Sequence, residues 1–148
     1  MAARTGYHSP TYIDCGGSAA TYSVMAPTGK RCIKAYDPKF LKGATSKAEK
    51  RRLELQRGLI GHSCEQLVTV YSVYEAEDTA FVEMEFIEWP QLKKVIADVP
   101  DQCVSTIIHE LVTAVVFLEK LDIVHRDIKP ENIHVSSDFN KLKLLDLG

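Results

Sequence analysis

The spacing of the apolar residues changes once along the chain, close to Trp89 and Pro90, and this change constrains the fold more than any other feature. Before it, short runs of β-branched and aromatic residues are separated by turn sequences such as residues 27–30 (PTGK), which is typical of antiparallel strands. After it, apolar residues recur at helical spacing. The chain is therefore predicted to have an α+β fold in two parts, with the boundary within residues 85–91.

Five strands and one helix are predicted for the first part. The strand sequences are TYIDC, TYSVMA, RCIKAY, LVTVYSVYE and TAFVEMEFI. Ser46 and Glu49 have the spacing of a capping box and mark the start of a helix over residues 46–60. Together they predict a small antiparallel sheet with one helix packed on it.

Helices dominate the second part. Residues 91–99 predict a short helix and residues 104–121 a longer one, followed by two short strands at 132–135 and 141–147. We therefore expect an N-terminal extension over residues 1–9, a first lobe over 10–88, and a partial, mainly helical second lobe over 89–148.

Composition excludes several classes of protein. The formal net charge of −2 shows no bias toward nucleic acid. Apolar runs such as AVVFL (residues 114–118) are too short to span a bilayer, and the N-terminus lacks a secretory signal. Four scattered cysteines fit neither a zinc site nor a disulfide framework. We expect a cytoplasmic protein that binds neither nucleic acid nor membrane.

The sequence IVHRDIKPENIHV, residues 123–135, carries the chemistry. It resembles the catalytic loop of eukaryotic-type protein kinases, whose HRDxxxxN pattern is matched by His125, Arg126, Asp127 and Asn132. The letters KPEN are the form found in serine/threonine kinases. The resemblance implies a kinase-like fold of two lobes, of which this sequence holds the first and part of the second.

The resemblance also implies roles for individual side chains. Asp127 would accept or orient the proton of the attacking hydroxyl, and Lys129 would place an ammonium group near the transferred phosphoryl group. Asn132 would offer its amide oxygen to Mg²⁺. The sequence DLG at residues 146–148 looks like the family's DFG, so Asp146 would be the second Mg²⁺ ligand. ATP and Mg²⁺ are the implied cofactors.

The nucleotide-binding residues are implied by two strand sequences. Lys34 in RCIK matches the lysine of V-A-I-K, which contacts the α- and β-phosphates, and Cys32 falls where the family places alanine against the adenine ring. The sequence VEMEFIEW resembles the hinge between the lobes. Met84 would be the gatekeeper, and the backbone of Glu85 and Ile87 would bond the edge of the adenine.

The glycine-rich loop departs from the family pattern GxGxxGxV. In the best register, which starts at Asp14, only the middle glycine, Gly16, is kept. The loop formed by Gly16, Gly17 and Ser18 is nevertheless small, so its backbone N–H groups are predicted to approach phosphate. Read without the resemblance, the same residues predict a tight turn.

The helix departs from the family pattern as well. Arg52 falls at the position of the family's glutamate, which pairs with the strand lysine. Glu49 lies one turn earlier on the same face and is the first-ranked partner for Lys34. Three explanations stay open: Glu49 takes over through a shifted helix, the register is off, or the ion pair is missing.

The family domain continues beyond DFG into an activation segment and the helices that bind protein substrate. The apolar helix over residues 104–121 would then need the missing part of the second lobe, or a partner, to cover it. Two main hypotheses follow. The chain is the front part of a serine/threonine kinase that transfers the γ-phosphoryl group of ATP to a protein substrate, or it is a non-catalytic, kinase-derived binding module. A small-molecule kinase is a third, weaker alternative.

Overall fold

The computed structural model of the protein describes residues 6–42, 46–76 and 78–147. The chain consists of two compact units: Met1–Gly61 with Val70–Phe86, and His62–Thr69 with Ile87–Gly148. The change from Phe86 to Ile87 falls within the stretch 85–91 where the apolar pattern changes. Residues 62–69 belong to the second unit, although they lie inside the range 10–88 expected for the first lobe.

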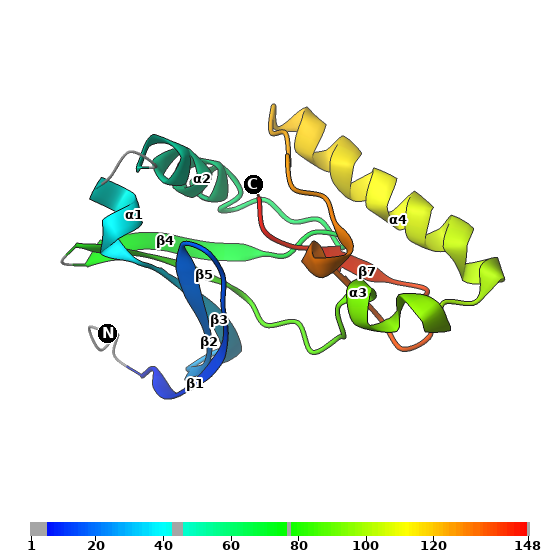
Figure 1. Ribbon diagram of the computed structural model, residues 1–148, viewed down its shortest axis with the longest axis horizontal. Helices are drawn as coiled ribbons and strands as arrows, with labels where there is room; N and C mark the ends of the chain where they lie inside the picture. Colours follow the sequence, from blue (N-terminus) through cyan, green and yellow to red (C-terminus); the bar gives the residue numbers. More distant parts are fainter. Residues whose placement is uncertain (1–5, 43–45, 77, 148) are drawn as a thin grey trace. The chain divides into compact units, whose positions relative to one another are not determined.

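The first unit is built on a five-stranded antiparallel sheet (Figure 1). Its strands are β1 (His8–Cys15), β2 (Ala19–Ala26), β3 (Gly29–Tyr36), β4 (Val70–Ala76) and β5 (Thr79–Glu85). Their order in the sheet is β1-β2-β3-β5-β4. Pro27 and Thr28 turn the chain between β2 and β3, and Gly29 takes a φ of 114°, which side chains disfavour. The predicted α+β fold with five antiparallel strands is confirmed.

One face of this sheet carries the apolar core of the unit. Val24, Ile33 and Phe81 are buried there, and the ring of Tyr74 stacks on Phe81 with the centroids 5.1 Å apart. These residues alternate with side chains on the opposite face, as the pleat of a strand requires. Val82 and Met84, on the opposite face of β5, are buried as well, so the central part of the sheet is covered on both faces.

Glu83 places a buried charge on the same face of β5 as Phe81. Its carboxylate accepts hydrogen bonds from the Tyr7 hydroxyl at 2.8 Å and the Ser72 hydroxyl at 2.9 Å, and Arg31 lies 3.8 Å away. A buried carboxylate is tolerated only when it is paired and hydrogen-bonded. This cluster also fixes the N-terminal segment that precedes β1 to the sheet.

Two helices follow β3, and only the second was predicted. They are α1 (Pro38–Lys42) and α2 (Ser46–Gly58). The buried residues of α2 are Glu49, Leu53 and Gln56, whose spacing of four and three places them on one face. This face packs near β4, and Figure 1 shows α2 lying over that strand. Two of the three buried side chains are polar, so the helix does not have a simple apolar stripe.

The second unit is mainly helical. Its elements are α3 (Leu92–Val95), η1 (Ile96–Asp98), α4 (Asp101–Lys120), η2 (Pro130–Asn132), β6 (Ile133–Val135) and β7 (Leu142–Leu144). The strands β6 and β7 form the expected antiparallel hairpin. The amide of Val68 donates to the carbonyl of Leu144 at 3.0 Å, and the amide of Leu144 donates to the carbonyl of Gln66 at 2.8 Å. These two bonds explain why residues 62–69 belong to this unit.

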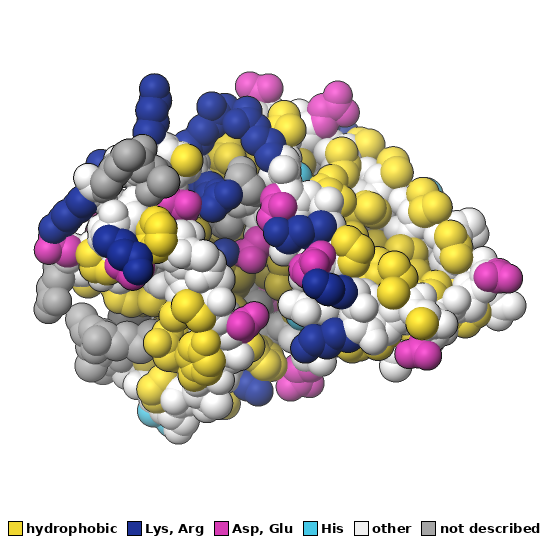
Figure 2. Space-filling model, viewed as in Figure 1, with side chains coloured by type: hydrophobic (Ala, Val, Ile, Leu, Met, Phe, Trp, Pro, Cys, Tyr) yellow, Lys and Arg dark blue, Asp and Glu magenta, His cyan; other side chains and the backbone are white. Residues whose placement is uncertain are grey.

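The long helix α4 is apolar on two sides. Ile107, Ala114 and Leu118 are buried, whereas five large apolar side chains are exposed. The exposed set consists of Val104, Ile108, Val112, Val115 and Val116. Figure 2 shows hydrophobic side chains gathered along this helix. Within the described ranges it is also the one helix long and apolar enough to cross a membrane, with a mean hydropathy of 1.4, a property that core helices of soluble proteins share.

The exposed face of α4 generates a prediction about association. Because contiguous exposed apolar surface favours self-association in water, we expect the 148-residue chain to sediment as oligomers. Replacing both Ile108 and Val112 with Gln should shift it toward the monomer, since these side chains are 56% and 52% exposed and carry little of the fold. Sedimentation velocity measures both chains, and a monodisperse unsubstituted monomer would contradict the prediction.

Candidate active site

The segment between α4 and β6 carries the predicted catalytic residues. After α4 ends at Lys120, Asp122 adopts a left-handed φ of 58° and the chain turns back beside the helix (Figure 1). Ile123 is buried and anchors the start of the segment. At its other end, η2 leads directly into β6. Buried structure therefore holds the segment at both ends.

Asp127 is held by two neighbouring side chains. The ammonium of Lys129 lies 2.8 Å from its Oδ2, and the Asn132 amide nitrogen donates to the same oxygen at 2.9 Å. Burial raises the pKa of Asp127, but the hydrogen bonds from Lys129 and Asn132 lower it further, so the pKa lies below its usual range. Both contacts use Oδ2, which leaves Oδ1 to accept a hydrogen bond from a hydroxyl group of another molecule.

His125 ties this segment to the end of β7. Its Nε2 lies 2.9 Å from the carbonyl of Leu145, and its Nδ1 accepts from the backbone amide of Asp127 at 3.3 Å. These partners require a neutral ring with the proton on Nε2. Burial lowers the pKa of His125, which favours that neutral form. His125 therefore orients Asp127 through its backbone.

Asp146 directly follows Leu145, whose carbonyl is hydrogen-bonded to His125. Leu145 also donates its amide to the carbonyl of Asn132 at 2.8 Å, so it is bonded to both ends of the catalytic segment. Asp146 adopts a φ of 56°, and Leu147 is buried. A non-glycine residue in the left-handed region is uncommon and is concentrated at functional sites. Asp146, the first residue of the predicted DLG sequence, thus directly follows a residue that is bonded to Asn132, whereas Gly148 lies outside the described residues.

The donor atoms of these residues are suited to a hard cation. The amide nitrogen of Asn132 is bound to the carbonyl and the carboxylate of Asp127, which leaves Oδ1 as the group that a metal would bind. Asp146 adds carboxylate oxygens. The described residues contain no cluster of three His, Cys, Asp or Glu side chains of the kind that forms a complete protein-only metal site. A small set of oxygen donors fits Mg²⁺, which keeps waters and phosphate oxygens as its other ligands.

In the first unit, three predicted nucleotide-binding side chains share one face of the sheet. Cys32 lies directly opposite Met84, and Lys34 lies directly opposite Val82. Residues directly opposite each other on antiparallel strands point to the same side, and residues two apart on a strand do so as well. Cys32, Lys34 and Met84 therefore lie together on the face opposite Ile33 and Phe81.

The predicted glycine loop is a tight turn between β1 and β2, where the amide of Gly16 donates to the carbonyl of Ala19 at 2.9 Å. A Cβ added to Gly17 would meet nothing within 4 Å, and neither glycine of the loop adopts a positive φ. Neither packing nor backbone conformation therefore demands glycine at position 17. The carboxylate of Asp14 accepts from the amide of Cys15 at 2.8 Å.

Glu49 is buried on α2, whereas the side chain of Arg52 is 41% exposed. The carboxylate of Glu49 is bound to Arg52 at 3.0 Å and to the hydroxyl of Ser18 at 3.2 Å. The face of α2 that meets the unit therefore presents the glutamate, with the arginine at its edge. Pairing between Glu49 and Lys34 stays a prediction.

The two predicted hinge residues lie on either side of the change between the units. Glu85 ends β5, and Ile87 begins the following segment of the second unit. Both residues are half-buried. The proposed contacts of their backbone with adenine stay a prediction.

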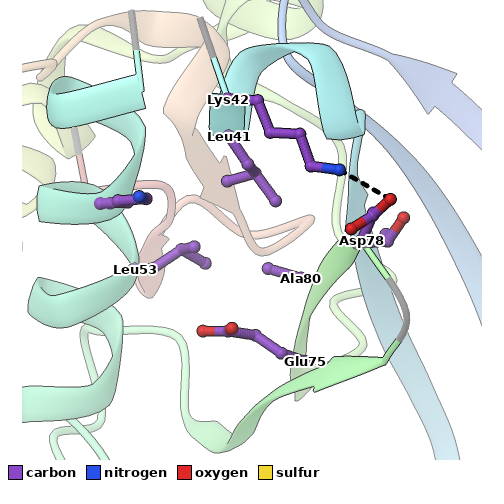
Figure 3. A pocket seen from close by; sticks show the side chains of 8 residues that line it. Leu41, Lys42, Leu53, Glu75, Asp78 and Ala80 are labelled. Carbon is purple, nitrogen blue, oxygen red and sulfur yellow. Dashed lines mark ion pairs between the residues drawn. The ribbon is translucent and has the colours of Figure 1, made fainter.

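A cavity of about 220 Å³ lies in the first unit between α1, α2 and the turn from β4 to β5. Leu41, Leu53 and Ala80 form its apolar part, and Lys42 reaches Asp78 across one side at 2.7 Å (Figure 3). None of the predicted site residues lines this cavity. It is therefore separate from the candidate active site.

Sequence reasoning missed two contacts that shape the site. Lys93 on α3 binds Glu131 at 2.8 Å, and this hydrogen bond lowers the pKa of Glu131. The second contact joins Ser18 to Glu49. Each pair is more than 30 residues apart, so no local pattern reveals it.

The chain belongs to the protein kinase domain family, whose model matches residues 12–148. This confirms the family that the catalytic segment resembles. The chain is 32% identical over 85 residues to the serine/threonine-protein kinase cds1 of Schizosaccharomyces pombe, a match that covers 55% of this chain and 18% of cds1. It spans only about a fifth of the length of the curated relatives that it matches.

Two solved structures resemble the fold. The crystal structure of Rad53 1-466 in complex with AMP-PNP has a TM-score of 0.75 at 23% identity, covering 94% of this chain and 38% of that chain. The Mycobacterium tuberculosis PknI kinase domain has a TM-score of 0.79 at 16% identity, covering 97% and 60%. At these identities the likeness establishes a kinase fold.

The histidines of the second unit predict a pH dependence of stability. Burial lowers the pKa of His125 and of His134, whose Nδ1 lies 2.6 Å from the carbonyl of Trp89. The unfolded chain therefore binds more protons than the folded one below the usual histidine pKa of about 6.5. The free energy of unfolding should fall as the pH drops through that value.

Urea unfolding at a series of pH values measures this dependence. His125→Gln and His134→Gln should each flatten the slope near pH ~6 because each removes one titrating group. His62→Gln, at an exposed position, is the control. A slope that is equal in all four proteins would contradict the prediction.

Proposed function

We propose that the chain provides the catalytic loop and nucleotide-binding residues of a serine/threonine protein kinase, which transfers the γ-phosphoryl group of ATP to a hydroxyl group of a protein. One observation carries the proposal: Asp127 is oriented by Lys129, Asn132 and His125, and Asn132 is bonded to the residue before Asp146. Family membership and the serine/threonine form KPEN support it.

Asp127 would receive the substrate. Its Oδ1 accepts the hydrogen bond of the serine or threonine hydroxyl, which orients the oxygen for attack and takes up its proton. The low pKa keeps the carboxylate ionised at neutral pH, so it is an orienting group and a weak base. Lys129 then supplies positive charge beside the phosphoryl group.

Asn132 and Asp146 would hold Mg²⁺ through the amide oxygen of one and the carboxylate of the other. The bound ion neutralises negative charge on the nucleotide phosphates. Asn132 would have a second task, because its amide nitrogen holds the Asp127 carboxylate and leaves its oxygen as the group that would bind the metal. One side chain thus connects the metal site with the group that orients the hydroxyl.

ATP would be bound by the predicted nucleotide-binding residues. Rad53, whose fold this chain resembles, was solved with AMP-PNP, which supports a nucleotide as ligand. Lys34 contacts the α- and β-phosphates, Gly16, Gly17 and Ser18 cover the phosphates, and the adenine meets Cys32, Met84 and the backbone of Glu85 and Ile87. Gly17 needs to be glycine neither for its φ nor for packing, which favours a role in leaving room for a ligand.

Two further proposals concern where the protein is located and what covers the exposed face of α4. The protein is cytoplasmic, and the exposed face of α4 is covered by a further part of the second lobe or by a partner. The alternative of a non-catalytic binding module has no observation in its favour.

Asp127→Asn tests the catalytic assignment. Asparagine keeps the shape and can still bind Asn132 and Lys129 through its oxygen, but it lacks the charge that orients and accepts the proton. The rate of peptide phosphorylation by the full-length protein should fall by about 100- to 10,000-fold. Nucleotide affinity, measured by calorimetry, should stay close to that of the unsubstituted protein. Retention of the full rate would contradict the assignment.

Lys34→Ala and Asp146→Ala test the nucleotide site. Each should weaken binding of Mg²⁺-ATP by about 10-fold or more, because hydrogen bonds and ion pairs with charged groups contribute ~1.5–3 kcal/mol. Lys120→Ala and Asp98→Ala, at exposed positions on α4 and η1, are the matched controls. Calorimetric titration separates the four, and unchanged affinity in both site variants would overturn the assignment.

A further inference from the structure

Two ion pairs connect the catalytic segment of the second unit with α3. The ammonium of Lys129 lies 2.8 Å from the carboxylate of Asp127, and the ammonium of Lys93 lies 2.8 Å from the carboxylate of Glu131. The hydrogen bond from Lys93 lowers the pKa of Glu131, and the charge of Lys129 adds to this effect. The four side chains are therefore linked in the order Asp127, Lys129, Glu131 and Lys93, with negative and positive charges alternating.

In both pairs the cation is the more exposed partner. The side chains of Lys93 and Lys129 are 63% and 46% exposed, whereas those of Glu131 and Asp127 are each 38% exposed. Figure 2 shows basic side chains at the surface over η2 and α3. A molecule that approaches this surface therefore meets mainly ammonium groups, because the carboxylates are less exposed and already paired.

We propose that Lys93 is a specificity-determining residue that binds an acidic side chain of the protein substrate, close to the serine or threonine that is phosphorylated. This inference rests on the proposed function, because that function places the substrate hydroxyl at Asp127. It names the class of substrate that the proposed function leaves open: a protein segment with an aspartate or glutamate near the acceptor residue.

Lys93 can bind a second carboxylate without leaving Glu131. An ammonium group has three donors, and Glu131 accepts one of them. A basic side chain in the same place would meet two ammonium groups, and it would reach the carboxylate of Glu131 only by displacing Lys93. One ion pair thus favours acidic residues of a substrate and disfavours basic ones.

The backbone holds α3 beside the catalytic segment independently of this ion pair. Leu92, the first residue of α3, is buried. Just before it, the carbonyl of Pro90 accepts from the amide of Val135 at 3.1 Å, and Gln91 forms a β-bridge with His134. Replacing Lys93 should therefore change the charge at this surface without moving the helix.

The next residue of α3 gives a matched control. Lys94 carries the same charge, is exposed, and points about 100° around the helix from Lys93. Lys93→Gln and Lys94→Gln each remove one positive charge from α3, but only Lys93→Gln removes the hydrogen-bonded partner of Glu131.

The experiment measures kcat/KM of the full-length protein for serine peptides that carry aspartate, alanine or arginine at one position near the acceptor. At the position that meets Lys93, the aspartate peptide should exceed the arginine peptide by about threefold or more, as expected for charge pairs open to water. Lys93→Gln should abolish or reverse this preference, because it removes the ammonium and uncovers Glu131. Lys94→Gln and Lys93→Arg should keep the preference within about twofold.

Glu131→Gln shows whether the reversal passes through Glu131. With both Lys93→Gln and Glu131→Gln, neither charge remains, so the rates for the aspartate and arginine peptides should differ by less than about twofold. Equal rates for all peptides in the unsubstituted protein, an unchanged preference in Lys93→Gln, or the same loss in Lys94→Gln would each overturn the inference. A merely structural ion pair predicts an equal loss of rate for every peptide in Lys93→Gln, which would overturn it as well.

Failure of the proposed function gives a different result. Binding of the same peptides, with alanine in place of the acceptor serine, is measured by fluorescence anisotropy. If no serine peptide is phosphorylated, but the aspartate peptide binds more tightly than the arginine peptide only while Lys93 is present, the kinase activity is refuted and the role of Lys93 stands. If peptides are phosphorylated regardless of their charge, the proposed function stands and this inference is refuted.

Discussion

Leu145 makes the two hydrogen bonds that position the residues of the predicted catalytic loop. Its carbonyl accepts from His125, and its amide donates to the carbonyl of Asn132. The first bond turns the ring so that its other nitrogen receives the amide of Asp127, while burial lowers the pKa of His125 and favours its neutral form. The second places Asp146 directly after a residue that is bonded to Asn132, whose amide holds Asp127. The backbone of Leu145 thus sets the positions of three polar residues: His125, Asp127 and Asn132.

Asp127 in the second unit and Glu49 in the first unit have carboxylates in different environments. Asp127 is partly exposed, its charge is balanced by Lys129, and its pKa lies below the usual range. Glu49 is buried, and its charge is balanced by Arg52. The carboxylate of Asp127 is accessible to another molecule, whereas the carboxylate of Glu49 depends on a neighbouring cation. The contrast follows from exposure, since a solvated carboxylate tolerates a changing environment and a buried one does not.

Much of the fold was predictable because its strands follow local rules. Short runs of β-branched and aromatic residues indicated five strands, and the turn sequence PTGK at residues 27–30 marked the start of β3. The helix α1 was not predicted, because it has five residues and no apolar periodicity. The buried face of α2 was also missed, since it carries Glu49 and Gln56 where a periodicity argument looks for leucine. Residues 62–69 pair with β7, and no pattern within eight residues predicts a partner so distant.

By itself, the sequence determined the family of the chain and predicted which side chains carry the chemistry. The order His125, Arg126, Asp127 and Asn132, followed by Asp146 one hairpin later, matches the pattern of the protein kinase family. Only the tertiary structure decided what holds them. Ser18 and Glu49 are 31 residues apart, and His125 and Leu145 are 20 apart. Such contacts form when strands and helices pack, so they depend on the whole fold and leave no trace in local spacing.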